Sequence, residues 1–281
     1  MGTNDTPDWN SFARKQAGER WRKQSAVMGR GLTELVAREA AVEPGMDVLD
    51  VACGTGEPGI MIATTLNGTG RVVGIDISAE PLGVARERAS QRKLTNASFQ
   101  QADVQQLPFE DSSFDRVTSR LGIMFFSDLA RAFAEIRRVL RPGGRFVAAA
   151  WGPLAQPYFN QTIGTVRRVI PDLNIPAGAA SMFRFGDPAA VHTALSSAGF
   201  AKVHAEIRTV PWNWEGPPPE LWEYFQAVTV PFAPLLNAIP KERKPEVDAE
   251  VESAFTALYD GSTVRMQAQF TLATANNCLS D

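Results

Sequence analysis

The sequence predicts an α/β fold with one seven-stranded, mostly parallel sheet, helices on both of its faces, and a helical cap over one edge. Strand patterns alternate with helix patterns from residue 46 to residue 150, as in parallel sheets with crossover helices. An apolar run at 48–51 leads straight into Gly54 and Gly56, which is typical of a buried strand followed by a tight turn. Two later strand patterns, at 200–210 and 264–274, complete the sheet.

The alternating segment contains five predicted strands and three predicted helices. The strands cover residues 46–52, 71–76, 97–102, 114–119 and 145–151, and the helices cover residues 57–67, 79–93 and 128–140. The helix at 128–140 is defined best, because Asp128 suits its N-cap and Phe133 and Ile136 share one apolar face. Pro142 and Gly143 mark its end.

The remaining segments predict how the chain is organised around this core. Residues 1–41 predict N-terminal helices of the cap, and residues 42–151 predict the ligand-binding core. The segments 152–186 and 211–262 interrupt the strand–helix alternation with prolines, aromatic residues and amphipathic helices, so we assign them to the cap. Residues 187–210 and 263–281 would supply the rest of the sheet.

Composition limits the class of function. Of 281 residues, 44% are hydrophobic and 21% charged, which is ordinary for a globular protein. The net charge of −3 argues against a nucleic-acid partner. No apolar run approaches the length of a membrane span, and the polar N-terminus does not resemble a signal peptide. With only two cysteines, a cytoplasmic enzyme is the expectation.

Acidic residues lie at the carboxyl ends of three predicted strands. Asp50 precedes the glycine turn, Asp76 ends the second strand, and Asp103 follows the third. Because ligands of doubly wound sheets bind at this end of the strands, the pattern predicts a nucleoside-binding crevice.

The residues of this crevice are compatible with two different cofactors. Gly54, Gly56 and Gly59 fit the Gly-x-Gly-x-x-Gly fingerprint of nicotinamide dinucleotides, and Asp76 follows at a suitable distance to hold a ribose. Asp50, however, would place a negative charge near a pyrophosphate, and Pro58 has no N–H to offer it. A ligand with an ammonium and a sulfonium group suits this acidic end better.

Several motifs in order carry a family resemblance. They are Leu-Asp-Val-Ala-Cys-Gly-Thr-Gly at 49–56, Gly-Ile-Asp at 74–76, Ala-Asp-Val at 102–104, Leu-Pro-Phe at 107–109, Ser-Phe-Asp at 113–115, and Arg-Val-Leu-Arg-Pro-Gly-Gly at 138–144. The series resembles class I S-adenosylmethionine-dependent methyltransferases, especially the small-molecule group of ubiquinone and menaquinone biosynthesis. It is dense over 42–151 and looser at 184–188 and 198–200. The resemblance implies a Rossmann-like fold, S-adenosyl-L-methionine as the cofactor and S-adenosyl-L-homocysteine as its product.

The resemblance also implies roles for individual residues. The methionine end of the cofactor would face Asp50 and the turn residues Ala52, Cys53, Gly54 and Gly56. The ribose would be held by Asp76, and the adenine would be contacted by Ile77, Asp103 and Val104. Arg120 and Leu121 would pass close to the sulfur through main-chain atoms, and Trp21 would lie over the cofactor. Ala52 stands where the family most often has glycine, which predicts slight crowding.

Other readings of these residues stay open at this stage. Asp50 could serve only to cap backbone amides, and Cys53 lacks a histidine partner, so we expect a packed thiol. The aromatic residues of the cap predict a packed core, with Trp151 and Tyr158 as candidate substrate contacts. No catalytic base is assigned, although Tyr158 and Arg120 are candidates, and no metal-ligand spacing occurs.

The sequence therefore predicts methyl transfer to a small aromatic or apolar metabolite by in-line displacement. Alternatives are an enzyme that uses S-adenosylmethionine without methylating, a cofactor-binding scaffold, and an NAD(P)-dependent oxidoreductase. The expected partner is a small-molecule acceptor, with neither nucleic acid nor a membrane span, and a homodimer is compatible with this reading.

Overall fold

The computed structural model describes residues 16–17 and 19–278, and the chain divides into two compact units. The sheet unit comprises residues 32–151, 185–208 and 270–281, and the helical unit comprises residues 1–31, 152–184 and 209–269. Residues 1–15 and 18 of the predicted N-terminal helical segment 1–41 lie outside the described residues. Each unit is described by itself.

A seven-stranded sheet forms the centre of the sheet unit, in the order β3-β2-β1-β4-β5-β9-β6. The strands are β1 (Asp47–Val51), β2 (Arg71–Asp76), β3 (Ala97–Gln101), β4 (Phe114–Arg120), β5 (Leu140–Trp151), β6 (Ala201–Pro211) and β9 (Gln267–Asn276). The first five are parallel neighbours, and β9 pairs with β5 in the antiparallel direction. The strand order reverses between β1 and β4, which is where open α/β sheets bind ligands.

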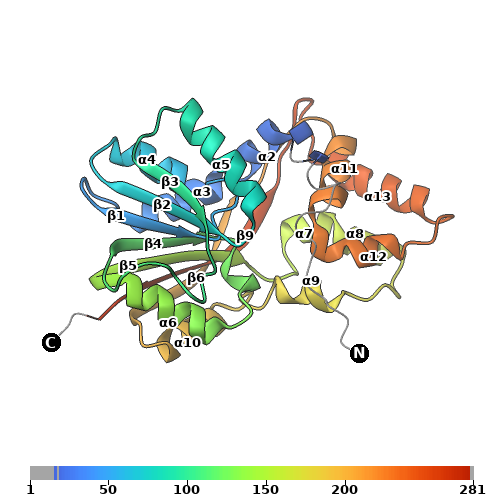
Figure 1. Cartoon of the computed structure of the whole chain (residues 1–281). Helices are drawn as coiled ribbons and strands as arrows, with labels where there is room; N and C mark the ends of the chain where they lie inside the picture. The colour runs from blue at the N-terminus through green and yellow to red at the C-terminus, as the bar shows by residue number, and fades with distance from the viewer. Residues whose placement is uncertain (1–15, 18, 279–281) are drawn as a thin grey trace. The chain divides into compact units, whose positions relative to one another are not determined.

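Helices cover both faces of this sheet. Figure 1 shows α4 and α5 on one face and α6 and α10 on the other. The helices are α3 (Arg30–Ala40), α4 (Gly59–Leu66), α5 (Ala79–Gln91), the 3-10 helix η1 (Ile123–Phe125), α6 (Leu129–Val139) and α10 (Pro188–Ser197). The amphipathic α6 has Asp128 as its N-cap, whose carboxylate accepts a hydrogen bond from the backbone N–H of Arg131. The predicted fold class, a mostly parallel, doubly wound sheet, is therefore confirmed.

The start of β5 differs from the prediction. Pro142 and Gly143 were expected to separate the helix from a strand beginning at 145, but β5 begins at Leu140, immediately after α6. The register against β4 shifts from Phe114–Leu140 to Arg116–Arg145. The proline and glycines therefore lie in an irregular stretch within the strand, where a bulge tolerates residues that a regular ladder does not.

The helical unit is built mainly from short helices. Its elements are α2 (Arg22–Met28), α7 (Pro157–Gln161), α8 (Ile163–Val169), α9 (Ala177–Ser181), α11 (Pro218–Val228), η2 (Val230–Phe232), α12 (Ala233–Asn237), α13 (Lys244–Thr256), and the strand pair β7 (Trp214–Glu215) and β8 (Thr263–Val264). Helices α7, α8 and α9 lie in the segment 152–186, for which no individual helix was predicted, because each is too short to show a helical period. Large buried rings fill its interior, among them Trp214, Trp222 and Phe225.

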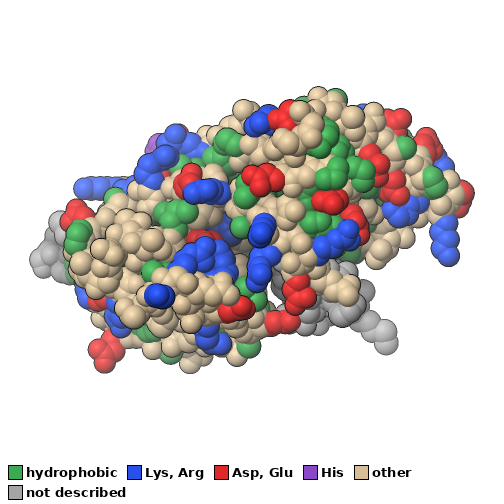
Figure 2. All heavy atoms as spheres, turned by 90° about the horizontal axis from the view of Figure 1, so that it is seen from above, with side chains coloured by type: hydrophobic (Ala, Val, Ile, Leu, Met, Phe, Trp, Pro, Cys, Tyr) green, Lys and Arg blue, Asp and Glu red, His purple; other side chains and the backbone are tan. Residues whose placement is uncertain are grey.

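Charged side chains of both signs are interspersed on the face drawn in Figure 2. Within residues 16–17 and 19–278, no helix combines the length and apolar character needed to cross a bilayer.

Candidate functional site

The glycine turn after β1 lies at the carboxyl end of the sheet and exposes its backbone. Gly54 has φ +53°, and a Cβ added there would meet no atom within 4 Å. Its N–H donates to Asp76 Oδ2 at 2.9 Å, and the N–H of Cys53 donates to the carbonyl of Ile75 at 2.9 Å. The turn is thus tied to the end of β2, with open space beside Gly54.

Asp50 supports this turn from inside the protein. Its side chain is fully buried, with Oδ2 accepting from the N–H of Gly59 at 3.0 Å and Oδ1 from the hydroxyl of Thr118 at 2.9 Å. Burial raises the pKa of Asp50 to about 7, although both hydrogen bonds and the positive charge of Arg120 act in the opposite direction. The structure thus gives Asp50 the backbone-capping contact that the sequence left open. A direct contact with a ligand remains a prediction.

The end of β2 combines a carboxylate with an exposed apolar side chain. Asp76 accepts from the N–H groups of Gly54 and Ser78, both at 2.9 Å. Ile77 is 67% exposed, although buried residues flank it in the preceding strand. In the part of the chain that the structure describes, only Val27 is a second large apolar residue of this kind. An isoleucine projecting from a strand end suits the flat face of a base.

The end of β3 brings Asp103 next to this pair. The N–H of Ala102 donates to the carbonyl of Asp76 at 3.1 Å, so the chain passes directly beside the end of β2. Asp103 Oδ1 accepts from the backbone N–H of Gln105 at 2.9 Å, and the Gln105 amide approaches both carboxylate oxygens at 3.2 and 3.3 Å. Asp103 and Val104 are both half-buried.

The chain after β4 completes this end of the sheet. Arg120 Nε donates to the carbonyl of Glu57 at 3.4 Å, and Leu121 adopts φ +60°. Ala52, where the family most often has glycine, also adopts a left-handed backbone, with φ +55°. A Cβ added to Gly122 would lie 2.5 Å from the Cβ of Ala52, so the missing side chain of Gly122 makes room for the Ala52 methyl group.

Cys53 is a packed thiol. It is 3% exposed and belongs to an apolar cluster that includes Ile60 and Phe99. Burial and the negative charges of Asp50 and Asp76 raise the pKa of its thiol far above the ordinary range. Any contribution of Cys53 to a ligand site would therefore come from its backbone.

The structure weakens the nicotinamide interpretation of the same turn. A pyrophosphate bound to Gly-x-Gly-x-x-Gly requires free N–H groups at the start of the following helix. Here Pro58 has none, and the N–H of Gly59 donates to Asp50. Both features remove N–H donors at the place where a bound phosphate would need them.

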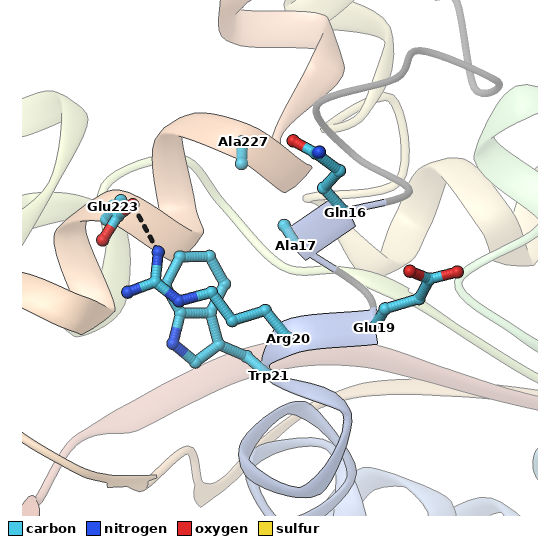
Figure 3. A pocket seen from close by; sticks show the side chains of 7 residues that line it. All are labelled: Gln16, Ala17, Glu19, Arg20, Trp21, Glu223 and Ala227. Carbon is cyan, nitrogen blue, oxygen red and sulfur yellow. Dashed lines mark hydrogen bonds and ion pairs between the residues drawn. The ribbon is translucent and has the colours of Figure 1, made fainter.

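Trp21, predicted to lie over a cofactor, belongs to the helical unit and is only 4% exposed. Its ring makes edge contacts with Trp214 and Tyr224, with centroids 6.3 and 5.9 Å apart. Figure 3 shows Arg20 lying across Trp21 and pairing with Glu223, at 2.7 Å. The adjoining hollow of about 670 Å³ is lined by Gln16, Ala17, Glu19, Arg20, Trp21, Glu223 and Ala227. The cofactor contact of Trp21 stays a prediction.

The two candidate substrate residues lie in packed interiors. Tyr158, in the helical unit, is 4% exposed and contacts Phe159, Trp212 and Phe225. Burial raises the pKa of Tyr158 well above its usual range, which makes it unsuitable as a general base near neutral pH. Trp151, in the sheet unit, packs on Phe270 with ring centroids 4.7 Å apart. Their roles as substrate contacts stay predictions.

Sequence reasoning missed three residues that shape this end of the sheet: Arg88, Gln105 and Gly122. Gln105 links Asp103 to the start of α6, where its side-chain oxygen accepts from Ser127 Oγ at 3.1 Å and from the N–H of Asp128 at 3.0 Å. Gly122 directly follows Leu121, a predicted site residue, so its position in the sequence could have indicated it. Arg88 and Gln105 offered none, because single polar residues on a helix or loop are ordinary surface residues.

Among residues 16–17 and 19–278, no group of three or more His, Cys, Asp or Glu side chains is placed to hold a metal ion.

The segment that contains these strand ends is similar to known proteins. Residues 42–165 match a family model described as a methyltransferase domain, which is less than half of the 281 residues. A demethylmenaquinone methyltransferase of Staphylococcus aureus (strain MRSA252) is 38% identical over 126 residues, 45% of this chain and 52% of that protein. A sterol 24-C-methyltransferase, ERG6B, of Gibberella zeae is 33% identical over 186 residues, 64% of this chain and 47% of that protein.

The chain therefore spans about half the length of the curated relatives that it matches. Among solved structures, the YcgJ protein of Bacillus subtilis superposes with a TM-score of 0.57 at 21% identity, covering 88% of this chain and 98% of that one. This likeness shows the fold. The family match confirms, for the segment 42–165, the resemblance inferred from the motifs: this segment is similar to a methyltransferase domain.

Proposed function

We propose that this protein transfers a methyl group from S-adenosylmethionine to a small apolar acceptor. The observation that carries the proposal is the arrangement at the carboxyl ends of the neighbouring strands β1 and β2. This edge of the sheet presents the open backbone at Gly54, the carboxylate of Asp76 and the exposed side chain of Ile77. An acidic group beside an apolar platform suits a ribose followed by a base.

The residues present fit this cofactor. The space beside Gly54 admits a ligand against the main chain, and Ile77 presents an apolar surface to a ring. Asp76 and Asp103 supply negative charge near a ligand whose ammonium and sulfonium groups are positive. Asp76 would hold the ribose hydroxyls, Ile77 and Val104 would contact the adenine, and Asp103 would accept from its amino group.

S-adenosylmethionine, when bound, supplies an electrophilic methyl group on a positively charged sulfur. The protein itself would bind the cofactor and the acceptor, orient them toward each other and exclude water. Alignment of two bound reactants can contribute roughly 7–11 kcal/mol, so no strong base is required for an acceptor that is already nucleophilic. Tyr158 is too deeply buried to serve as that base, and Arg120 donates to a backbone carbonyl.

The acceptor class rests on the relatives. Two of them are named for demethylmenaquinone and for a sterol, both largely apolar molecules. The aromatic residues of the helical unit fill its interior, as the packed-core prediction expected, so they add little support for this acceptor class. A cytoplasmic location is part of the same proposal, supported by the free thiols of Cys53 and Cys278.

Calorimetric titration with S-adenosylhomocysteine, with NADH and NADPH run in parallel, tests the cofactor. Micromolar binding of the sulfur nucleoside alone supports the proposal, and binding of a nicotinamide nucleotide instead would overturn it. Turnover is then tested by mass spectrometry with a panel of quinols, sterols and phenols. A gain of one methyl group in an acceptor supports methyl transfer. An isomerised product without added mass would indicate cyclisation, and no turnover across the panel would favour a cofactor-binding scaffold.

A further inference from the structure

We infer that Arg88 is a positioning residue that holds the glycine turn in the shape needed to bind the cofactor. The inference rests on the proposed function and assigns a specific residue to it. Arg88 lies in the last turn of α5 and reaches the segment after β1. Its Nη1 donates to the carbonyl of Thr55 at 2.6 Å and approaches Thr55 Oγ1 at 3.3 Å, while Nη2 donates to Glu57 Oε1 at 2.7 Å.

These contacts bind the glycine turn at two residues, Thr55 and Glu57. Thr55 lies between the two glycines, and Glu57 directly precedes the proline that opens α4. A planar guanidinium that binds a carbonyl and a carboxylate at once fixes both the distance and the angle between them. Lysine, with a single ammonium group, cannot reproduce this fork.

The ion pair is also shielded. The side chains of Arg88 and Glu57 are 16% and 17% exposed, so solvent screens the pair less than it screens a surface pair. Glu57 Oε2 is buried and has no hydrogen-bond partner among the described residues. Removing Arg88 would therefore leave a shielded carboxylate without its counter-charge next to the turn, and the turn would move to solvate it.

Helix α5 touches the site at both of its ends. Its N-cap, Ser78, donates its backbone N–H to Asp76, and Arg88 near its C-terminus holds the turn whose Gly54 donates to the same carboxylate. The position of α5 and the shape of the glycine turn are thus linked through Asp76. A change at Arg88 is expected to alter ligand affinity more than overall stability.

Arg86 provides a matched control. It lies on the same helix two residues earlier, and its Nε donates to the carbonyl of Phe99 in β3 at 3.0 Å. It thus makes a similar side-chain-to-backbone hydrogen bond, but with the edge strand instead of the turn. Comparing Arg88→Met with Arg86→Met separates an effect on the turn from the general loss of an arginine on α5.

The experiment measures the dissociation constant of S-adenosylhomocysteine by calorimetry, together with the Tm of each variant. We expect Arg88→Met to weaken binding roughly 10-fold or more, as expected for charge-assisted hydrogen bonds, and Arg86→Met to change it less than about 2-fold. Arg88→Lys should recover part of the loss. Glu57→Gln, which keeps the bond to Thr55, should lie between wild type and Arg88→Met, and it replaces Arg88→Met if that variant does not fold.

The outcomes separate the two proposals. Wild-type protein that does not bind the sulfur nucleoside would overturn the proposed function and this inference with it. If wild type binds but Arg88→Met and Glu57→Gln bind equally well, the positioning role alone is wrong. Equal losses in Arg88→Met and Arg86→Met, in step with their Tm values, would also overturn it, because they would show a purely structural effect.

Discussion

The methyl group of Ala52 lies in the space that a side chain on Gly122 would need: a Cβ on Gly122 would come within 2.5 Å of the Ala52 Cβ. Ala52 follows β1 and Gly122 follows β4, the two strands between which the strand order reverses. Ala52 has φ +55°, a conformation that costs a residue with a Cβ roughly 1–2 kcal/mol. The two residues therefore share one limited space, which Ser119 Oγ, 2.7 Å from the same Cβ position, also bounds, so glycine at position 52 relieves part of the crowding at position 122.

A double-mutant cycle tests this relationship. Gly122→Ala should destabilise the protein by about 1–3 kcal/mol, because overpacking forces the backbone of one segment to move. In an Ala52→Gly background the same change should cost less, with a coupling energy of about 1 kcal/mol or more. Ala52→Gly alone should be close to neutral, since relief of the left-handed strain is offset by greater freedom of the unfolded chain. Urea denaturation of the four proteins measures the coupling.

Gly83→Ala is the control for this cycle. A Cβ on Gly83, within α5, would meet no atom within 4 Å, so alanine there should stabilise the helix by roughly 0.5–1 kcal/mol. Additive effects of Gly122→Ala and Ala52→Gly would contradict the shared-space interpretation.

The buried carboxyl of Asp50 predicts a pH dependence of stability. Its pKa in the folded state is raised to about 7, above its value in the unfolded chain, so the folded protein binds a proton between about pH 4 and pH 7 that the unfolded chain does not. The free energy of unfolding contributed by this group therefore falls as the pH rises through this window. A shift of this size corresponds to roughly 4 kcal/mol.

Asp50→Asn should remove this contribution while keeping both neighbours satisfied. The amide oxygen can accept from the N–H of Gly59, and the amide nitrogen can donate to the hydroxyl of Thr118. Denaturant titrations at pH 5 and pH 8 should show a smaller loss of stability for Asp50→Asn than for wild type. Parallel losses in the two proteins would mean that Asp50 stays ionised throughout.

The fold was predictable because its signals are local and repeated. Alternating strands and helices, the glycine turn and the N-cap at Asp128 each depend on a few neighbouring residues. The beginning of β5 was not predictable, because a bulge lets proline and glycine lie within a strand. Helices α7 and α9 have five residues each, too few to show a period.

The site was predictable in part, for a related reason. Asp76, Ile77 and Asp103 lie at strand ends, where topology alone brings residues together. The orientation of a side chain does not follow from topology. Asp50 turns into the protein toward Thr118, and Arg88 reaches the turn from a helix 33 residues further along the chain. Such long-range polar contacts depend on packing that a sequence pattern does not encode.

Ile77 permits a test of the proposed nucleoside site with little effect on folding. Because its side chain is 67% exposed, Ile77→Ser should leave the Tm within about 1–2 °C, as expected for a surface change. The affinity for S-adenosylhomocysteine should fall several-fold, since serine offers a ring less apolar surface. Val27→Ser, at the other exposed apolar residue of the described chain, serves as the control and should change neither quantity. Unchanged affinity in Ile77→Ser would remove Ile77 from the site.

Asp76 accepts two backbone hydrogen bonds and is proposed to bind the ribose, and a matched variant separates these two roles. Asp76→Ala removes the acceptor for the N–H groups of Gly54 and Ser78, so the Tm should fall, and the affinity for S-adenosylhomocysteine should fall by about 1–3 kcal/mol. Asp260, in the helical unit, caps two backbone N–H groups in the same way, those of Ser262 and Thr263 at 3.0 and 2.9 Å. Asp260→Ala should therefore lower the Tm without changing the affinity. Calorimetry and thermal unfolding of both variants decide the matter, because a loss of affinity shared by the two alanine variants would mean that Asp76 acts only through the stability of its turn.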